Sequence, residues 1–398
     1  MNNMLDFGSL CVQEWKELRT TPPHQLPIYA TSSFVLDDLE HGIDIFAGKA
    51  QGHTYSRYGN PTIDAVAAKI AALETHGLDI TSSALLTSSG MSAIATLAMA
   101  LLRPGDKLLT QGNLYGGTTE LFSQIMAPLG IESIFIDLGD LDKVEAVMAS
   151  NAAIRMVYME TPANPTMACV DIAALAALAK QHGAYSAIDN TFCTPYLQQP
   201  FRFGVDFVVH STTKFLNGHG NSIAGIVIGR DQELVATRIA KTLKLTGATC
   251  NAWDAWLINN GLKTLELRMI RHSRNAMEIA RFLAQHPRVG RVNYNGLPSH
   301  PHHELAKIQM RDFGGMLSFE VKGGLEAAVG FIKKLQFCTM APTLGDVDTL
   351  VLHPASMSHV NIPSEVRQQY GITGGLVRVS VGIENAADII ADLEQALA

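Results

Sequence analysis

The sequence lacks the features that mark several classes of protein. Its 398 residues include only 5 cysteines, scattered and without a CxxC pair, which argues against a disulfide framework or a zinc site and favours a reducing compartment. The sequence has no run of about 18 apolar residues, which is the length needed to span a membrane. It also has no basic segment followed by an apolar one, which would mark a secretory signal. With 30 basic residues against 37 acidic ones, no positive excess favours nucleic acid. We therefore expect a cytoplasmic protein with no metal, membrane or nucleic-acid partner.

Composition and length favour a folded protein of two or three domains. Hydrophobic residues make up 47% of the chain and charged residues 17%, which excludes an intrinsically disordered chain. Residues 1–60 show no sustained periodicity and are predicted to form an extended arm. Residues 61–256 are predicted to form a large domain. Residues 257–398 are predicted to form a smaller α/β domain, with helices at 274–284, 325–335 and 386–397 and strands at 316–321 and 376–381.

Short apolar runs alternate with helical patterns in the predicted large domain. The strands are expected at 84–87, 107–110, 133–136, 155–159, 185–188, 207–210 and 223–228. Helices are expected between several of them, at 92–102, 118–128 and 172–181. This alternation predicts an α/β fold with a mostly parallel sheet covered on both faces. Ligands bind at the carboxyl ends of the strands in such sheets, so chemistry is expected there.

Polar residues follow several of these strands. Gly90 lies in a strand-to-helix turn at 88–92, where first-turn amides can bind an anion. Asp189 closes the strand at 185–188. Taken alone, each segment is better explained as an ordinary turn or helix cap.

The segment after the strand at 207–210 is more specific. Ser211 and Thr213 point to the same side of an extended backbone and offer two hydroxyls to one anion. Lys214 follows at once, before a glycine-rich loop, which suits an amine that bonds covalently to a carbonyl group. Asn164 stands between two prolines that hold its loop rigid. A lysine, an acid for a ring nitrogen and a phosphate cradle are the parts that pyridoxal phosphate requires.

Several longer motifs resemble those of one enzyme family. They lie at residues 55–62, 89–91, 114–118, 160–165, 189–190, 211–218 and 375–378, and they cover almost the whole chain. The sequence is similar to the trans-sulfuration, or Cys/Met metabolism, family of fold-type I pyridoxal-phosphate enzymes. This resemblance implies the aspartate aminotransferase-like fold, with a large, mostly parallel sheet domain and a smaller C-terminal domain.

The resemblance assigns contacts to pyridoxal 5′-phosphate. Lys214 would carry the cofactor covalently, Asp189 would pair with its ring nitrogen, and Tyr115 would stack on the ring. Asn164 would form a hydrogen bond near the ring hydroxyl. The phosphate would be held by Gly90, Met91, Ser211 and Thr213.

The resemblance also implies contacts with the substrate and with other subunits. Arg378 would bind the carboxylate of a small amino acid through its forked guanidinium, with Thr343 and Asn164 beside it. Tyr55 and Arg57 would reach the phosphate of the neighbouring subunit. The expected assembly is a homotetramer built from two dimers.

The implied reaction is γ-elimination from an amino acid. Lys214 would take the α-proton, and Tyr115 would exchange a proton near the leaving group. The products would be 2-oxobutanoate, ammonia and the leaving group. If a thiol were added instead, the enzyme would be a γ-synthase or a sulfhydrylase.

A few positions bear on the choice of substrate. Pro342 stands where cystathionine γ-lyases and γ-synthases usually carry a glutamate, which disfavours both. The 353–359 stretch resembles methionine γ-lyases most, although Gly117 and Leu245 replace a cysteine and an aspartate usual in those enzymes.

We rank γ-elimination from L-methionine or a related γ-substituted amino acid first, and O-acetyl- or O-succinylhomoserine sulfhydrylase second. Reactions of cystathionine, and elimination from an unusual substrate such as canavanine, remain alternatives. A non-enzyme regulator is not favoured, because Lys214, Asp189 and Arg378 are all present.

Overall fold

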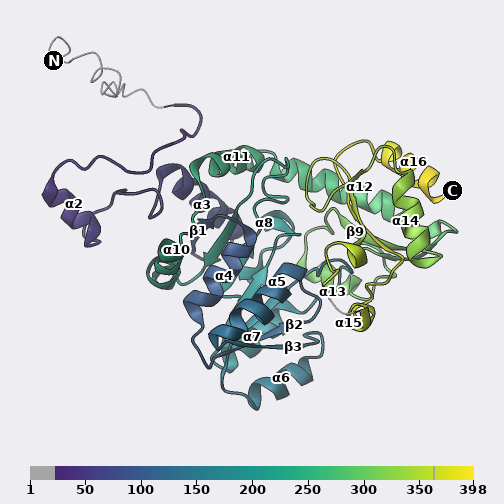
Figure 1. Cartoon of the computed structure of the whole chain (residues 1–398), viewed down its shortest axis with the longest axis horizontal. Coiled ribbons are helices and arrows are strands. Elements are labelled where there is room, and N and C mark those ends of the chain that lie inside the picture. Colours follow the sequence, from purple (N-terminus) through teal and green to yellow (C-terminus); the bar gives the residue numbers. More distant parts are fainter. Residues whose placement is uncertain (1–22, 362–363) are drawn as a thin grey trace, which may run out of the picture.

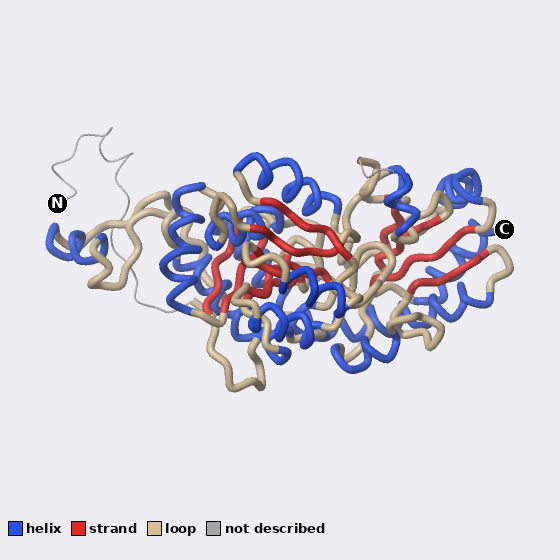
Figure 2. The backbone as a smooth tube through the Cα atoms, turned by 90° about the horizontal axis from the view of Figure 1, so that it is seen from below, coloured by secondary structure: helices blue, strands red, loops and turns tan. Residues whose placement is uncertain are grey.

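The computed structural model describes residues 23–361 and 364–398, so residues 1–22 of the predicted arm lie outside the described part of the chain. An arm leads into a large domain around one sheet, and a smaller domain around a second sheet follows (Figure 1). Both sheets lie among helices (Figure 2). No helix in the described part is both long and apolar enough to cross a bilayer.

The sheet of the large domain has seven strands in the order β1-β7-β6-β5-β4-β2-β3. They are β1 (Ser83–Thr87), β2 (Lys107–Gln111), β3 (Glu132–Ile136), β4 (Ile154–Glu160), β5 (Tyr185–Asp189), β6 (Phe207–His210) and β7 (Gly225–Gly229). β7 pairs antiparallel with both of its neighbours, and the other pairs are parallel. The predicted mostly parallel α/β sheet is confirmed.

Helices cover both faces of this sheet because its strands are apolar on both sides. Leu108 packs into one hydrophobic core with α4 (Gly90–Leu101), and its neighbour Leu109 packs into the other with α3 (Pro61–Glu74) and α7 (Ile172–Gln181). The remaining helices of this domain are α5 (Gly116–Glu120), α6 (Leu141–Ala149), α8 (Thr194–Leu197), α9 (Gln232–Leu234), α10 (Ala240–Thr246) and α11 (Ala252–Leu262).

Side-chain caps fix where the helices nearest the carboxyl edge begin. Ser89 caps α4 by accepting a hydrogen bond from the Ser92 amide, and the Ser92 hydroxyl accepts one from the Ser89 amide in return. Asp171 caps α7 with a single hydrogen bond, which its carboxylate accepts from the Ala174 amide. These caps hold the strand-to-helix turns in place.

The smaller domain is built on a five-stranded sheet in the order β10-β11-β12-β9-β8. Its strands are β8 (Val289–Asn293), β9 (Met316–Val321), β10 (Thr339–Met340), β11 (Leu350–Leu352) and β12 (Leu376–Ser380). Its helices are α12 (Leu265–Gln285), α13 (His303–Gln309), α14 (Gly324–Lys334), α15 (Ser364–Gln369) and α16 (Ala386–Leu397). Residues of α12, α14 and α16 form one hydrophobic core with this sheet.

The described part of the arm contains a helix that the sequence pattern did not predict. α2 (Leu39–Phe46) is capped by Asp38, whose carboxylate accepts a hydrogen bond from the His41 amide. The helix stands away from the large domain (Figure 1). Its apolar residues Leu39 and Phe46 are 72% and 66% exposed, so no core formed by the described residues covers them.

Two predicted elements differ from the structure. The helix expected at 118–128 is α5 followed by a π-helical segment, Leu121–Met126, and a short 3₁₀ turn, Ala127–Leu129. The strand expected from residue 223 begins at Gly225. The reason is that the Thr213 hydroxyl bonds both the amide and the carbonyl of Ala224, at 3.1 Å each, and so occupies them before the strand starts.

Candidate active site

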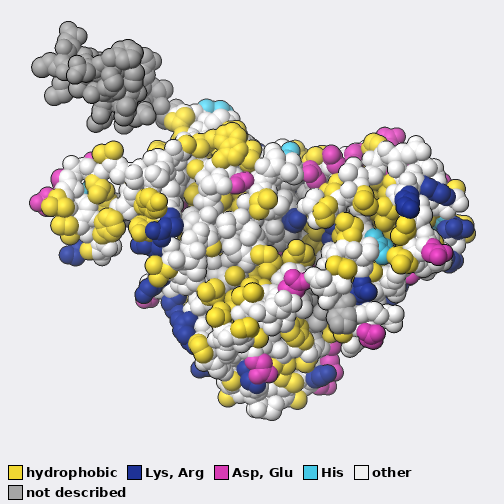
Figure 3. All heavy atoms as spheres, in the orientation of Figure 1, with side chains coloured by type: hydrophobic (Ala, Val, Ile, Leu, Met, Phe, Trp, Pro, Cys, Tyr) yellow, Lys and Arg dark blue, Asp and Glu magenta, His cyan; other side chains and the backbone are white. Residues whose placement is uncertain are grey.

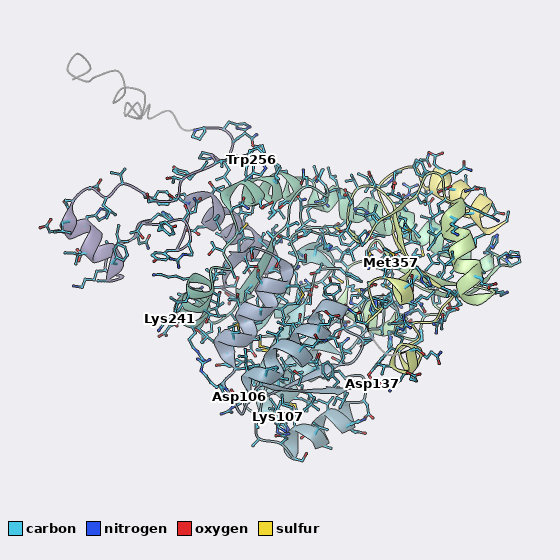
Figure 4. The ribbon with its side chains drawn as sticks, viewed as in Figure 1. Asp106, Lys107, Asp137, Lys241, Trp256 and Met357 are labelled. Atoms are coloured by element: carbon cyan, nitrogen blue, oxygen red, sulfur yellow. The ribbon has the colours of Figure 1, made fainter. Side chains whose placement is uncertain are left out.

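A cavity of about 730 Å³ opens at the carboxyl edge of the large sheet, where the smaller domain meets it. The segments after β1, β4, β5 and β6 supply one wall. Thr343, Met357 and Arg378 of the smaller domain supply the other. Met357 faces the junction between the two domains (Figure 4).

Most of the site residues expected from the sequence meet in this cavity. Those that line it are Gly90, Met91, Tyr115, Asn164, Asp189, Ser211, Thr213, Lys214, Thr343 and Arg378. Tyr55 and Arg57 do not line it.

The turn at the start of α4 is shaped to hold an anion. The amides of Gly90 and Met91 belong to the first helical turn and have no intrahelical acceptor, whereas the Ser92 amide is already bound by Ser89. A Cβ at position 90 would lie 2.7 Å from the Ser211 Cβ, so only glycine lets these segments approach so closely. The cradle therefore combines two free amides with the Ser211 side chain, which suits a phosphate.

Asp189 is a carboxylate without a strong cation beside it. The Thr191 amide donates a 2.9 Å hydrogen bond to its Oδ1 atom. Burial raises its pKa, while the hydrogen bonds from Thr191 and the nearby His210 oppose that rise. A protonated ring nitrogen placed against this carboxylate would supply the missing positive charge.

Thr343 accepts a hydrogen bond from both the Lys214 amine and the Arg378 guanidinium. Lys214 Nζ donates a 2.9 Å hydrogen bond to Thr343 Oγ1, and Arg378 Nη2 donates one of 2.9 Å to the Thr343 carbonyl. Burial, together with the charge of Arg378, lowers the pKa of Lys214 to about 8. The lowered pKa makes the neutral amine, the form that a nucleophile or base requires, much more accessible near physiological pH than in an ordinary lysine.

Arg378 is a buried cation that has no acidic partner in residues 23–361 and 364–398. Its Nη1 atom donates a 3.3 Å hydrogen bond to Asn164 Oδ1, and its Nε atom is buried with no partner within that part of the chain. Burial lowers its pKa to about 10. A bound carboxylate would complete this arrangement by accepting from the free N–H and neutralising the charge.

Tyr115 forms an edge of the cavity. Its ring packs over Gly117, where a Cβ would lie 2.7 Å from Tyr115 Cε1 and 3.2 Å from Met91 Sδ. The ring is 45% exposed in the single chain, so its outer face is free to stack on a planar ligand.

The structure places Tyr55 and Arg57 on the arm, away from the cavity of their own chain. Arg57 Nη1 donates a 2.7 Å hydrogen bond to the Lys244 carbonyl, and its guanidinium lies 4.7 Å from the centre of the Tyr58 ring. Tyr55 is 41% exposed. Neither residue contacts the cofactor cradle of this chain.

Sequence reasoning missed two residues of the cavity wall that hold others in place. Thr191 bonds the Asp189 carboxylate through its amide and accepts a 2.8 Å hydrogen bond from the Ser211 amide, which ties the ends of β5 and β6 together. Glu160 lies at the end of β4, the kind of position that singled out Asp189. Within the described part of the chain, no group of three or more His, Cys, Asp and Glu residues is placed to hold a metal ion.

Comparison with known proteins agrees with this site. The profile of the family described as "Cys/Met metabolism PLP-dependent enzyme" matches residues 9–398. An L-methionine gamma-lyase of Fusobacterium nucleatum subsp. polymorphum is 47% identical over 373 residues, which is 94% of this chain and 93% of that protein. An O-succinylhomoserine sulfhydrylase of Pseudomonas aeruginosa is 40% identical over 392 residues, which is 98% of this chain and 95% of that protein.

A solved structure of similar shape is the cystathionine gamma synthase of Xanthomonas oryzae pv. oryzae, in complex with aminoacrylate and cysteine. It superposes with a TM-score of 0.87 at 38% identity, and the match covers 94% of this chain and 92% of that one. The chain belongs to the Cys/Met metabolism family of PLP-dependent enzymes, and its cofactor is pyridoxal phosphate. The cradle at Gly90 and the buried Asp189 fit that cofactor's phosphate and ring nitrogen.

Proposed function

We propose that this enzyme is a γ-lyase that converts L-methionine, or a closely related γ-substituted amino acid, to 2-oxobutanoate, ammonia and the leaving group. The observation that carries this proposal is that few charged side chains line the cavity. Among the described lining residues only Glu160, Asp189, Lys214 and Arg378 are charged. Glu160 and Asp189 lie at the cofactor end of the cavity. Lys214 is assigned to the cofactor and to the α-carbon of the substrate, and Arg378 to the substrate carboxylate.

The rest of the wall suits a small apolar thioether. Pro342, Met357 and Ile223 line it, together with uncharged polar groups. No charged side chain remains in this wall to receive the distal amino-acid group of cystathionine or the carboxylate of a succinyl ester, and an unpaired charge is costly to bury. The similarity to methionine γ-lyases supports the same choice.

The proposed roles follow from the contacts in the site. Bound pyridoxal phosphate stabilises the negative charge that develops on the α-carbon of an amino acid joined to it. Lys214 carries the cofactor and, once released, takes the α-proton on Nζ. Thr343 Oγ1, 2.9 Å from that atom, holds the free amine in place. Arg378 and Asn164 orient the substrate carboxylate.

Tyr115 moves a proton near the leaving sulfur, since its ring edges the cavity beside Met91. Gly90, Met91, Ser211 and Thr213 hold the phosphate, and Asp189 keeps the ring nitrogen protonated. Overall, L-methionine and water give methanethiol, ammonia and 2-oxobutanoate. The carbon–sulfur bond breaks and there is no net oxidation.

The test is to incubate the cofactor-loaded protein with L-methionine and to measure 2-oxobutanoate and methanethiol. We expect the two products in equal amounts. If neither forms while the cofactor stays bound, methionine is not the substrate.

A second candidate is an O-acylhomoserine sulfhydrylase, which the similarity to the Pseudomonas aeruginosa enzyme over 98% of this chain supports. Incubation with O-acetyl- or O-succinylhomoserine and hydrosulfide distinguishes the two activities. The sulfhydrylase would be favoured if the rate of homocysteine formation from the O-acyl substrate exceeds the rate of methionine consumption in the lyase assay.

We further propose that two subunits complete each site within a homotetramer. The exposed apolar residues of the arm support this, with Val35 at 97% and Ile43 at 56% exposed. Apolar side chains gather on the projecting arm in Figure 3. Burial against another copy of the chain would remove this surface from water.

A further inference from the structure

One carboxylate of the cavity wall bonds the backbone of two proposed site residues at once. Glu160 Oε2 accepts a 2.8 Å hydrogen bond from the Tyr115 amide, and Glu160 Oε1 accepts one of 3.0 Å from the Asn164 amide. The residue is 6% exposed. Tyr115 precedes α5 and Asn164 follows β4, so the carboxylate joins two segments of the fold that both line the cavity.

The backbone of Glu160 is itself held in a fixed position. Its amide donates a 3.1 Å hydrogen bond to Gln111 Oε1, and its carbonyl accepts one of 2.9 Å from Gln111 Nε2. In the pairing of β4 with β5, Glu160 stands opposite Asp189. Gln111 and the sheet therefore aim the carboxylate at Tyr115 and Asn164.

Only a carboxylate of this length satisfies both contacts. Both partners are N–H donors, so the bridge requires two acceptor atoms. A glutamine would turn an NH₂ group toward one of the two amides and leave that buried donor without an acceptor. An aspartate would keep both acceptors but is shorter by one methylene.

An acidic group is kept here in an unfavourable place. Burial, followed by the charge of Asp189, raises the pKa of Glu160, and the two amide hydrogen bonds, which favour the ionised carboxylate, oppose that rise. Keeping such a group where an apolar residue would fill the space points to a role in the site.

We propose that Glu160 is a positioning residue, which fixes the Tyr115 ring and the Asn164 amide relative to each other and so sets the orientation of the cofactor between them. This inference rests on the proposed cofactor contacts of Tyr115 and Asn164. It does not depend on which amino acid is the substrate.

The competing explanation is that Glu160 only stabilises the fold. The chain offers a matched control in Asp392 of α16, which is 5% exposed. Its carboxylate accepts hydrogen bonds from the amides of Gln336, Phe337 and Cys338, at 2.7 to 3.0 Å. It does not line the cavity. Glu160→Gln and Asp392→Asn make the same chemical change, one in the site and one outside it.

The experiment compares the two variants with the unmodified holoenzyme. Three quantities are measured: the visible circular dichroism of the bound cofactor, the values of kcat and KM, and the thermal midpoint of the cofactor-free protein. We expect both variants to lose thermal stability. Only Glu160→Gln is expected to lose about half or more of the visible dichroic band and about tenfold or more in kcat, because small misplacements of reacting groups are costly.

A Glu160→Gln holoenzyme with an unchanged dichroic band and unchanged kcat would overturn the proposal, whatever its stability. If this variant does not fold, Glu160→Asp is measured in the same way. It keeps a carboxyl group but is too short to span both amides, so the same loss of dichroism is expected, and an unchanged band would again overturn the proposal. If the unmodified protein does not consume methionine, the dichroic comparison still tests this inference, so its failure is distinguishable from failure of the proposed function.

Discussion

Two inactive variants of this enzyme should restore each other's activity when their subunits mix. The first, Lys214→Ala, lacks the amine that is proposed to carry the cofactor. The second, Arg57→Ala, lacks a guanidinium that does not line the cavity of its own chain and instead contacts the Lys244 carbonyl at 2.7 Å. If Arg57 serves the neighbouring subunit, a mixed dimer contains one site with both residues intact and one site with neither.

The expected recovery follows from counting. Random pairing of equal amounts gives mixed dimers in half of the cases, and half of their sites are intact, so activity should return to about a quarter of the unmodified value. The assay is product formation by the co-expressed and purified mixture, compared with each variant alone.

A control pair locates the effect. Lys214 and Arg378 line the same chain's cavity, so a mixture of Lys214→Ala with Arg378→Ala should stay inactive. If the mixture of Lys214→Ala with Arg57→Ala is equally inactive although mixed oligomers are present, the arm does not complete a neighbouring site.

Three further results are expected. Burial lowers the pKa of Lys214 from 10.5 to about 8, so the unfolded chain binds an extra proton between these values and the stability of the cofactor-free protein should rise with pH across that window. Lys214→Met should remove this rise and add up to about 3 kcal/mol to the free energy of unfolding at pH 7; denaturant titrations that show no such difference would contradict the burial argument. Arg378→Lys keeps the charge but loses the fork, so kcat/KM should fall about 100-fold, mostly through KM; an unchanged KM would remove Arg378 from carboxylate binding. Gly117→Ala should push the Tyr115 ring from its place and lower kcat/KM about tenfold, since the new Cβ would lie 2.7 Å from Cε1; full activity would mean that the ring position does not matter.

The elements that could be predicted from the sequence are those with strong local signals. β6 and β9 are mostly apolar, and α7 and α16 carry helical periodicity with a capping Asp or Asn. All four occupy the predicted residues. α2 was missed because it is only eight residues long, so the helical spacing of Leu39, Ile43 and Phe46 is too brief to stand out in an otherwise irregular arm. β7 begins late because the Thr213 side chain, eleven residues earlier in the same loop, occupies the Ala224 backbone, which no local pattern reveals.

The residues of the candidate site fall into the same two groups: those with a local sequence signal, and those whose role depends on contacts between distant parts of the chain. Lys214, Asp189 and Asn164 follow strands and were identified from local sequence together with the motifs. The hydrogen bond between Lys214 and Thr343 joins residues 129 positions apart, so only the folded chain shows it. The bridging role of Glu160 was missed for the same reason, because its partner Tyr115 lies 45 residues away in the sequence.

The position of Arg378 on β12 has a mechanical consequence. Lys214, which is proposed to act on the α-carbon, belongs to one domain, and the guanidinium that is proposed to hold the carboxylate belongs to the other. In the single chain this junction already has direct hydrogen bonds: the Ser318 hydroxyl donates one of 2.7 Å to the Pro165 carbonyl, and Lys214 Nζ donates one of 2.9 Å to Thr343 Oγ1. A bound amino acid adds a further, removable connection between the two halves of the molecule. Substrate occupancy should therefore stiffen the whole chain, and each product release should loosen it again.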